Sequence, residues 1–364
     1  MLARAPGEAG GAAALPTVEA PCFLCGAADA RPLWATPDRA FAVPGVYTVA
    51  RCRRCGFLYQ RPRVRDEHLA DCYPDHYPRH QEPSPRIPFK GGSARVRAVR
   101  WALASELGYT VWRAAGAGLL TRLRARLLLR RLRWDCPAWR GRGRYLDVGC
   151  GSGGALGVAA ALGWQVAGVE VDAAAAAKAR RFTPRVHTGD LQAAPFAAGE
   201  FDLITALHVL EHVPDPVGAV RRMLGWLAPG GLLVIEVPNA GGLGARIFGR
   251  AWSGLELPRH LSHFTPATLE RAAAQAGGRA QAGARAHAAP GPRGAARRGD
   301  PGRDRARLAQ PARDPRVVAH QPLRVHRELR GEAAVEAAEP PSRAVGLPLE
   351  QRVLLIGGAD GELR

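Results

Sequence analysis

Short apolar runs alternate with amphipathic segments between residues 144 and 276, and this alternation predicts a wound α/β domain. Strands are expected at the apolar runs, which are residues 145–148, 165–171, 185–187, 201–207 and 232–237. Helices are expected at residues 154–162, 173–181, 216–227 and 266–276. Because strands and helices take turns along the chain, the sheet should be mostly parallel and doubly wound.

The starts of three of these helices carry recognisable capping residues. Asp172, Asp215 and Thr265 stand where an N-cap side chain accepts a hydrogen bond from the first turn. Pro216 and Pro266 follow two of them, and proline suits the first helical turn because that turn does not use its N–H.

The rest of the chain divides by composition. We expect a flexible leader at 1–20, a Cys-, Pro- and Tyr-rich module at 21–80, a basic helical segment at 90–140, the α/β domain at 141–276 and a low-complexity tail at 277–364. The tail has no Phe, Trp, Tyr or Cys and too few apolar residues to bury a core. Either it is a natural disordered tail or a frameshift in a GC-rich gene produced it, and the second explanation is slightly favoured.

Charge is less informative here than its size suggests. The 364 residues carry a net charge of +19, but only Lys90 and Lys178 are lysines, and the arginine excess is typical of GC-rich codons. Between Arg95 and Arg144, thirteen arginines face two acidic residues, so this stretch is a solvated helix face, a contact for anionic lipid or a contact for RNA. No apolar run approaches the roughly 18 residues of a membrane span, and the start lacks a signal-peptide pattern, so a cytoplasmic location is expected.

Four cysteines form two C-x-x-C-G knuckles. Cys22 and Cys25 make the first, and Cys52 and Cys55 make the second after 26 intervening residues. Two such pairs supply four thiolates in a tetrahedron, which predicts a closed, structural Zn²⁺ site that serves folding and not catalysis. Iron and metal-free cysteines are the alternatives.

A glycine-rich turn connects the first predicted strand of the α/β domain to its helix. Gly149, Gly151 and Gly153 lie in this turn, and Glu170 ends the next strand, 21 residues after Gly149. Such a turn lets a ligand approach bare backbone, while the carboxylate can accept both hydroxyls of a ribose. A nucleotide-like cofactor is therefore expected. Because Gly154 completes G-x-G-x-x-G, NAD is one possibility.

Later segments resemble the ordered signature of the class I S-adenosylmethionine-dependent methyltransferases. The resemblance covers residues 144–276 and is carried by the segments 147–153, 168–170, 189–190, 201–204 and 227–231. It implies a Rossmann-like fold and S-adenosylmethionine as cofactor. It further implies that Asp147, Gly149, Gly151 and Gly153 surround the methionine part, Glu170 binds the ribose and Asp190 meets the adenine amino group. Asp190 capping a loop turn is the alternative.

Four histidines lie near this expected cofactor site. His208 and His212 follow the strand at 201–207, and His260 and His263 lie in a segment shared with bacterial relatives. Each is a candidate base for a hydroxyl acceptor because histidine titrates near neutral pH, and a structural histidine is the alternative in each case. Residues 210–216 resemble the ubiquinone-pathway O-methyltransferases, some of which hold a divalent metal at E-x-x-E-H. Here His208 occupies the first position.

The resemblance also implies two more strands after residue 276, and the tail offers only poor candidates such as 352–356. The C-terminal strands are therefore expected to be missing. The leading functional hypothesis, from the methyltransferase resemblance, is methyl transfer to an oxygen, carbon or nitrogen of a small molecule. The cysteine module resembles the N-terminal part of bacterial methyltransferases of glycan or natural-product pathways, which implies a role in such biosynthesis. The alternatives are an RNA methyltransferase, which lacks an aromatic-rich signature here, an NAD-dependent oxidoreductase, and a non-catalytic zinc-binding protein. The oligomeric state is open.

Overall fold

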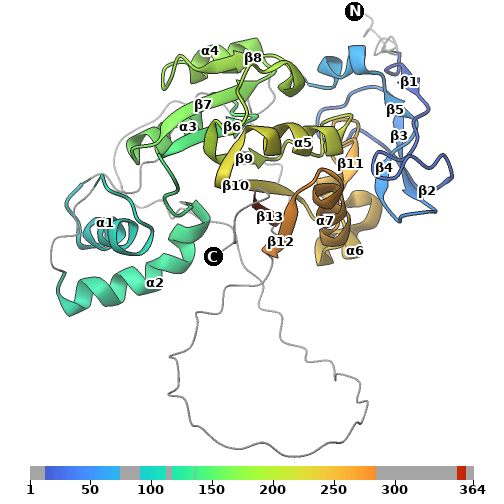
Figure 1. Ribbon diagram of the computed structural model, residues 1–364. Helices are drawn as coiled ribbons and strands as arrows, with labels where there is room; N and C mark the ends of the chain where they lie inside the picture. The colour runs from blue at the N-terminus through green and yellow to red at the C-terminus, as the bar shows by residue number, and fades with distance from the viewer. Residues whose placement is uncertain (1–12, 74–90, 112–116, 136, 284–350, 358–364) are drawn as a thin grey trace, which may run out of the picture.

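Two β-sheets organise the molecule (Figure 1). The computed structural model describes residues 13–73, 91–111, 117–135, 137–283 and 351–357. The larger sheet has seven strands in the order β12-β13-β10-β9-β6-β7-β8. Its five parallel neighbours are β6 (Arg144–Val148), β7 (Gln165–Glu170), β8 (Val186–Thr188), β9 (Phe201–Leu207) and β10 (Leu227–Pro238). The expected wound, mostly parallel sheet is confirmed.

The last two strands of this sheet are present, and the expectation that they are missing is wrong. β13 (Gln351–Gly357) runs antiparallel between β10 and β12 (Arg279–Gly283). Without β13 the whole edge of β10 would present unpaired backbone groups, and the seven-residue register from Leu232↔Gly357 to Pro238↔Gln351 satisfies them. Both strands lie beyond the boundary expected at residue 276. The rest of the tail, residues 284–350 and 358–364, lies outside the described residues. The structure therefore does not test the disordered-tail and frameshift hypotheses there.

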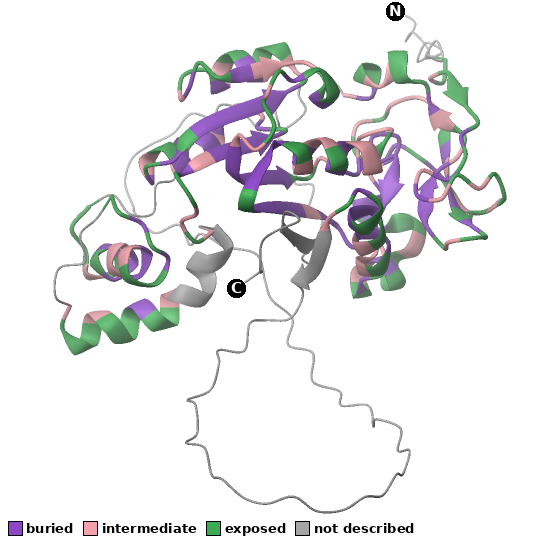
Figure 2. Ribbon diagram, in the orientation of Figure 1, coloured by how far each residue is buried: buried purple, intermediate pink, exposed green. Residues whose placement is uncertain are grey.

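Helices cover both faces of the seven-stranded sheet. On one face, α5 (Pro216–Trp226) and α7 (Pro266–Gln275) pack on alternate strand residues such as Leu146 and Ile204. The opposite face is covered by α1 (Ala94–Glu106), α2 (Leu119–Asp135), α3 (Gly154–Ala161) and α4 (Ala173–Ala179). Strands β6, β7, β9 and β10, which lie between these layers, are buried over most of their length (Figure 2). Successive side chains of a strand point to opposite faces of the sheet, and here both faces are covered by helices. These strands therefore appear in the sequence as continuous apolar runs.

The three predicted N-caps are confirmed. Asp172 accepts a hydrogen bond from the Ala175 amide at 2.6 Å, and Asp215 accepts one from Gly218 at 2.8 Å. Thr265 forms a capping box with Thr268. Most predicted boundaries lie within two residues of those observed, and the largest difference is at β10. This strand begins at Leu227, five residues before the predicted start at 232, because a register shift between these residues lets the Pro-Gly-Gly segment stay within the strand.

The smaller sheet has the order β11-β4-β3-β2 and is built mainly from N-terminal residues. Its strands are β2 (Ala30–Pro37), β3 (Val46–Cys52), β4 (Leu58–Gln60) and β11 (Ser262–His263). Beside it, β1 (Thr17–Val18) pairs with β5 (Arg63–Val64), and η1 (Asp66–His68) and η2 (Ala70–Cys72) follow. The end of the expected flexible leader is therefore an ordered strand, because β5 pairs with its backbone. Residues 1–12 lie outside the described part.

A segment of the α/β domain belongs to this smaller sheet. After α6 (Leu243–Phe248), η5 (Gly249–Ala251) and η6 (Ser253–Leu255), the chain forms β11, which pairs antiparallel with β4. Just before β11, the buried guanidinium of Arg259 forms two 2.8 Å contacts with the carboxylate of Asp38. The N-terminal module and the α/β domain are thus joined both by backbone pairing and by a buried ion pair.

Candidate functional site

The predicted glycine turn lies at the carboxyl edge of the seven-stranded sheet. Gly149 has φ +72°, and a Cβ there would lie 2.5 Å from Cγ2 of Val209, so the close approach of the 208–213 segment requires glycine. Gly151 has φ +52°, and among the described residues no atom beyond its own chain neighbours lies within 4 Å of the position that its Cβ would take. Its bare backbone therefore borders open space, as a cofactor cradle requires. Gly153 is the N-cap of α3.

Glu170, at the end of β7, holds this turn in place. Its Oε2 accepts a hydrogen bond from the Gly151 amide at 2.7 Å, and its Oε1 accepts one from the Asp172 amide at 2.9 Å. Each carboxylate oxygen has two lone pairs, so both retain an acceptor position for a ribose hydroxyl. The structure therefore gives Glu170 a positioning role in the turn, in addition to the ribose contact expected from the sequence.

Asp190 and two exposed apolar residues lie at the same edge of the sheet. Asp190 follows β8 and accepts a hydrogen bond from the Gln192 amide at 2.6 Å, which is the capping arrangement considered for it above. Val171 after β7 is 65% exposed, and Leu207 at the end of β9 is 39% exposed. Large apolar side chains exposed where parallel strands end can contact the flat faces of an adenine. Neither residue was predicted from the sequence as a site residue, because an apolar residue at the end of a strand is ordinarily part of the core.

Asp147 lies inside the sheet at the end of a short hydrogen-bond chain. The Thr205 hydroxyl donates to Asp147 Oδ1 at 2.6 Å and receives a hydrogen bond from Tyr145 at 2.7 Å. Burial raises the pKa of Asp147 to about 6, and the hydrogen bonds from Thr205 and Tyr145 only partly oppose this rise. A cationic group of a ligand beside Asp147 would relieve this cost.

His208 is an imidazolium at neutral pH. Its Nδ1 lies 3.1 Å from Oε1 of Glu211, and its Nε2 lies 3.4 Å from Oε1 of Glu236. Hydrogen bonds with these two carboxylates raise the pKa of His208 to about 10, more than burial lowers it. A ring that already holds both protons cannot accept another, so His208 is suited to orient Glu211 and not to act as a base.

His263 is neutral for the opposite reason. Its side chain is buried, and neither ring nitrogen has a hydrogen-bond partner among the residues that the structure describes. Burial, with a smaller effect of His260, lowers the pKa of His263 to about 3. A base with so low a pKa holds a proton poorly near neutral pH.

His212 and His260 face each other, with ring centroids 4.7 Å apart. The carbonyl oxygen of Arg259 lies 3.2 Å from Nδ1 of His212 and can only accept, so this contact favours the tautomer with the proton on Nδ1. The Tyr73 hydroxyl lies 2.9 Å from the same Nδ1. Tyr73 comes from the N-terminal module and was not a predicted site residue, because nothing local in its sequence indicates a partner 139 residues away.

The same cluster has the composition of a divalent-metal site. Ligand atoms of Glu211, His212 and His260 lie within 4.8 Å of one another. The Oε2 atom of Glu211 is buried, and within the described part of the chain it has no hydrogen-bond partner. One carboxylate and two imidazoles are ligands that zinc and other first-row metals accept. The arrangement can therefore hold a proton-accepting histidine or a metal ion.

The four knuckle cysteines come together as predicted. The Cys22 and Cys55 sulfurs are 3.5 Å apart, as are those of Cys25 and Cys52, and all four lie within 4.8 Å of one another. Zinc–sulfur bonds of about 2.3 Å in a tetrahedron imply sulfur–sulfur distances of about 3.8 Å, so the group is close to the required size. Burial raises the pKa of Cys52, but backbone amides of Cys55 and Arg54 and the Cys25 side chain outweigh it and lower that pKa to about 7.

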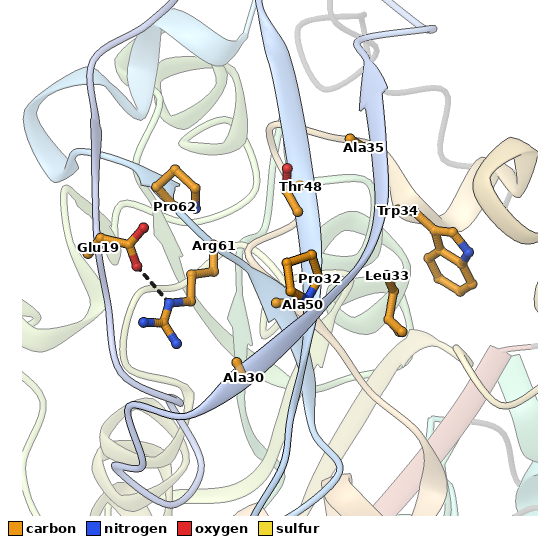
Figure 3. A pocket seen from close by; sticks show the side chains of 10 residues that line it. All are labelled: Glu19, Ala30, Pro32, Leu33, Trp34, Ala35, Thr48, Ala50, Arg61 and Pro62. Atoms are coloured by element: carbon orange, nitrogen blue, oxygen red, sulfur yellow. Dashed lines mark hydrogen bonds and ion pairs between the residues drawn. The ribbon is translucent and has the colours of Figure 1, made fainter.

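A shallow groove lies elsewhere, on the outer side of the N-terminal sheet (Figure 3). Pro32, Trp34 and Thr48 line part of it, and Arg61 donates a hydrogen bond to Glu19 at 2.6 Å beside it. None of the candidate residues named above lines this groove, so it belongs to a different part of the surface.

Comparison with known proteins identifies related sequences. Residues 114–280 match a protein family described as "Methyltransferase domain". The ubiquinone biosynthesis O-methyltransferase of Thiobacillus denitrificans is 34% identical over 164 residues, which are 40% of this chain and 69% of the relative. Its counterpart in Albidiferax ferrireducens is 35% identical over 104 residues, which are 26% of this chain and 41% of the relative. The chain thus spans from two fifths to two thirds of these relatives.

Solved structures give weaker matches. YcgJ from Bacillus subtilis is 22% identical with a TM-score of 0.36, covering 42% of this chain and 69% of that one. An S-adenosylmethionine-dependent methyltransferase from Archaeoglobus fulgidus is 25% identical with a TM-score of 0.35, covering 43% of this chain and 71% of that one. These scores are too low to bear on function.

The raised pKa of Asp147 leads to a stability prediction. In the wild type, the Asp147 carboxyl group contributes to the free energy of unfolding. This contribution is fully present below the pKa of 3.8 in the unfolded chain and is lost as pH rises through the pKa of about 6 in the folded chain. Asp147→Asn should therefore raise the unfolding free energy of the ligand-free chain at pH 8 by up to about 3 kcal/mol, with the gain vanishing near pH 4. Denaturant titrations across this pH range measure it.

Asp202→Asn is the matched control. Arg144 holds the pKa of Asp202 below its usual range despite burial, so this substitution should lower stability at neutral pH, with the loss shrinking on acidification. Equal, pH-independent losses in both variants would contradict the assignment.

Proposed function

The chain belongs to the class I S-adenosylmethionine-dependent methyltransferases, and on this basis we propose that it transfers a methyl group to an oxygen of a small-molecule acceptor. The observation that carries the proposal is the position of the His212 segment: Val209 packs against Gly149 of the cofactor turn, three residues before the candidate base. Family membership leaves the oxidoreductase alternative without support. The chain covers only part of its relatives, so the activity remains a proposal for this chain.

The carboxyl edge of the sheet fits the cofactor. Bare backbone at Gly151, the remaining lone pairs of Glu170 and the exposed Val171 suit, respectively, the methionine part, the ribose and the adenine. We assign Asp147 and the turn at Gly149 and Gly153 to the same site, and Asp190 to the adenine amino group. When bound, S-adenosylmethionine supplies a methyl group activated by its sulfonium charge.

His212 is the proposed base. The contact with the Arg259 carbonyl favours the tautomer with the proton on Nδ1, so Nε2 accepts the proton of the acceptor hydroxyl. With the cofactor bound, the acceptor oxygen would receive the methyl group, and the sulfur would leave with the electron pair of the bond that breaks. Most of the rate gain comes from alignment, and Tyr73 and Arg259 contribute by fixing the His212 ring. His260 packs against His212 and sets one side of the cluster.

The relatives' name supports oxygen as the acceptor atom, since both are called ubiquinone biosynthesis O-methyltransferases. A glycan or natural-product acceptor remains a hypothesis that rests on the resemblance of the cysteine module. Because Tyr73 of that module contacts His212, we infer that the module forms one side of the acceptor site. If RNA is the methyl acceptor instead, an acceptor assay that includes RNA would show methylation of RNA and not of the small molecules.

We further propose that Cys22, Cys25, Cys52 and Cys55 hold a structural Zn²⁺. The spacing of their sulfurs supports it, because all four lie within 4.8 Å of one another, close to the size of a tetrahedral thiolate shell. Both knuckles have the same backbone geometry, with Gly26 and Gly56 at φ +71° and +76°. All four ligand positions are filled by protein, so the ion would serve folding.

His212→Gln tests the catalytic proposal. Loss of the base should lower kcat for methyl transfer to a panel of phenols and sugars by about 10²–10⁴-fold, with the affinity for S-adenosylmethionine unchanged. Tyr73→Phe should have a smaller effect on kcat, and His68→Gln, which alters an exposed histidine paired with Asp71, should have none.

A chelator distinguishes the two uses of the cluster. Activity should persist in EDTA if His212 is a base. The zinc of the four-cysteine group is measured in the same samples. Loss of activity in EDTA while that zinc is retained, with recovery on adding a divalent cation, would show that Glu211, His212 and His260 bind a metal instead and would contradict the assignment.

Cys52→Ser tests the zinc site. The variant should contain less than one zinc per chain and unfold at lower temperature, because metal binding and folding of the module are coupled. Cys72→Ser is the matched control: Cys72 is buried but is not part of the four-cysteine group, so its zinc content should stay at one. Equal metal content in wild type and Cys52→Ser would count against the site.

A further inference from the structure

α2 presents a stripe of leucines to solvent. Leu119, Leu120, Leu123 and Leu127 are 82%, 69%, 55% and 73% exposed, whereas Ala125 on the same helix is 1% exposed. Ala125 packs into the cluster formed by α1 and the sheet. An amphipathic helix in a globular protein normally turns its apolar stripe inward, so α2 has a second apolar face that its own fold does not use.

Arginines flank this stripe on both sides. Consecutive helical residues are about 100° apart, so the four leucines occupy an arc of about 100° directed away from Ala125. Arg122 and Arg126 follow one border of the arc and Arg124 follows the other, and all three are exposed. The helix sequence holds six arginines and a single acidic residue, Asp135.

This arrangement matches a helix that lies in the plane of a membrane surface. The leucines of such a helix enter the boundary between the headgroups and the acyl chains. The arginine side chains on either side are long enough for their guanidinium groups to reach the lipid phosphates. The surrounding stretch from Arg95 to Arg144, with thirteen arginines and two acidic residues, adds attraction to anionic lipid. An RNA contact would use the arginines but leave the exposed leucines without a purpose.

We propose that α2 docks the chain on the surface of a membrane that contains anionic phospholipids. Among the described residues, no helix is long and apolar enough to cross a bilayer, so the contact is peripheral. α2 lies at the lower left of the folded part in Figure 1, on the opposite side from the N-terminal strands β2–β5. The proposal does not depend on the methyltransferase activity.

Vesicle co-sedimentation with the full chain tests this. The chain should bind vesicles of equal parts phosphatidylcholine and phosphatidylglycerol, and should bind pure phosphatidylcholine far more weakly. Each arginine near the surface contributes about fivefold, so Arg122→Gln, Arg124→Gln and Arg126→Gln together should weaken binding about a hundredfold. Leu123→Ser with Leu127→Ser should weaken it at least about tenfold, because less apolar surface is buried.

Matched controls keep charge and exposure constant. Arg31→Gln, Arg39→Gln and Arg54→Gln remove three exposed arginines elsewhere, and Val46→Ser with Ile247→Ser removes two apolar residues that are 68% and 60% exposed. Both control variants should bind vesicles within about twofold of wild type. Unchanged far-ultraviolet circular dichroism and melting temperature verify that the α2 variants fold.

Three results would overturn the proposal. The first is equal binding of the α2 variants and wild type to anionic vesicles. The second is retention on transfer RNA without binding to vesicles. The third is a dimer in solution that the leucine variant dissociates while vesicles bind neither form, which would identify a second copy of the chain as the partner.

Discussion

One buried guanidinium joins the two halves of this protein. The Arg259 side chain has no exposed surface, contacts both carboxylate oxygens of Asp38 at 2.8 Å and donates to the Cys72 carbonyl at 3.0 Å. Glu256 lies 3.1 Å from its Nε, and the ring of Phe41 covers it. Leaving either charge of such a buried pair alone costs about 3–5 kcal/mol, so Arg259 and Asp38 must be buried together. A substitution that removes only one of the two charges would therefore destabilise the junction between the N-terminal module and the α/β domain.

The candidate acceptor site depends on this junction. The carbonyl of the same Arg259 contacts His212. His260 follows Arg259 directly in the chain, and His263 lies four residues after it. On the module side, Tyr73 follows Cys72, whose carbonyl receives the Arg259 hydrogen bond. The cysteine knuckles support this arrangement from a distance, since Phe57, next to the second knuckle, packs on Phe264 after β11. A change in the cysteine module would therefore reach His212 through packing and hydrogen bonds.

Local features of the fold were predictable from the sequence, and distant pairings were not. Strand runs, the caps at Asp172 and Asp215 and the glycine turn each depend on residues within one or two turns of chain. The Arg259–Asp38 pair spans 221 residues and the Tyr73–His212 contact spans 139, and no local pattern encodes either. The segment 352–356, which is part of β13, was judged a poor candidate because a short apolar run in an arginine-rich tail carries no sign of the open edge of β10. For the histidines, residue type suggested four bases, whereas two carboxylates raise the pKa of His208 and burial lowers the pKa of His263.

The central claim is that the carboxyl edge of the larger sheet binds S-adenosylmethionine, and calorimetry of the purified chain tests it most directly. We expect the chain to bind S-adenosylmethionine at one site with micromolar affinity and to give no heat of binding with NAD. The sample should also melt cooperatively, which verifies that the chain is folded. A folded chain that binds neither ligand would contradict it, as would a chain that binds NAD instead.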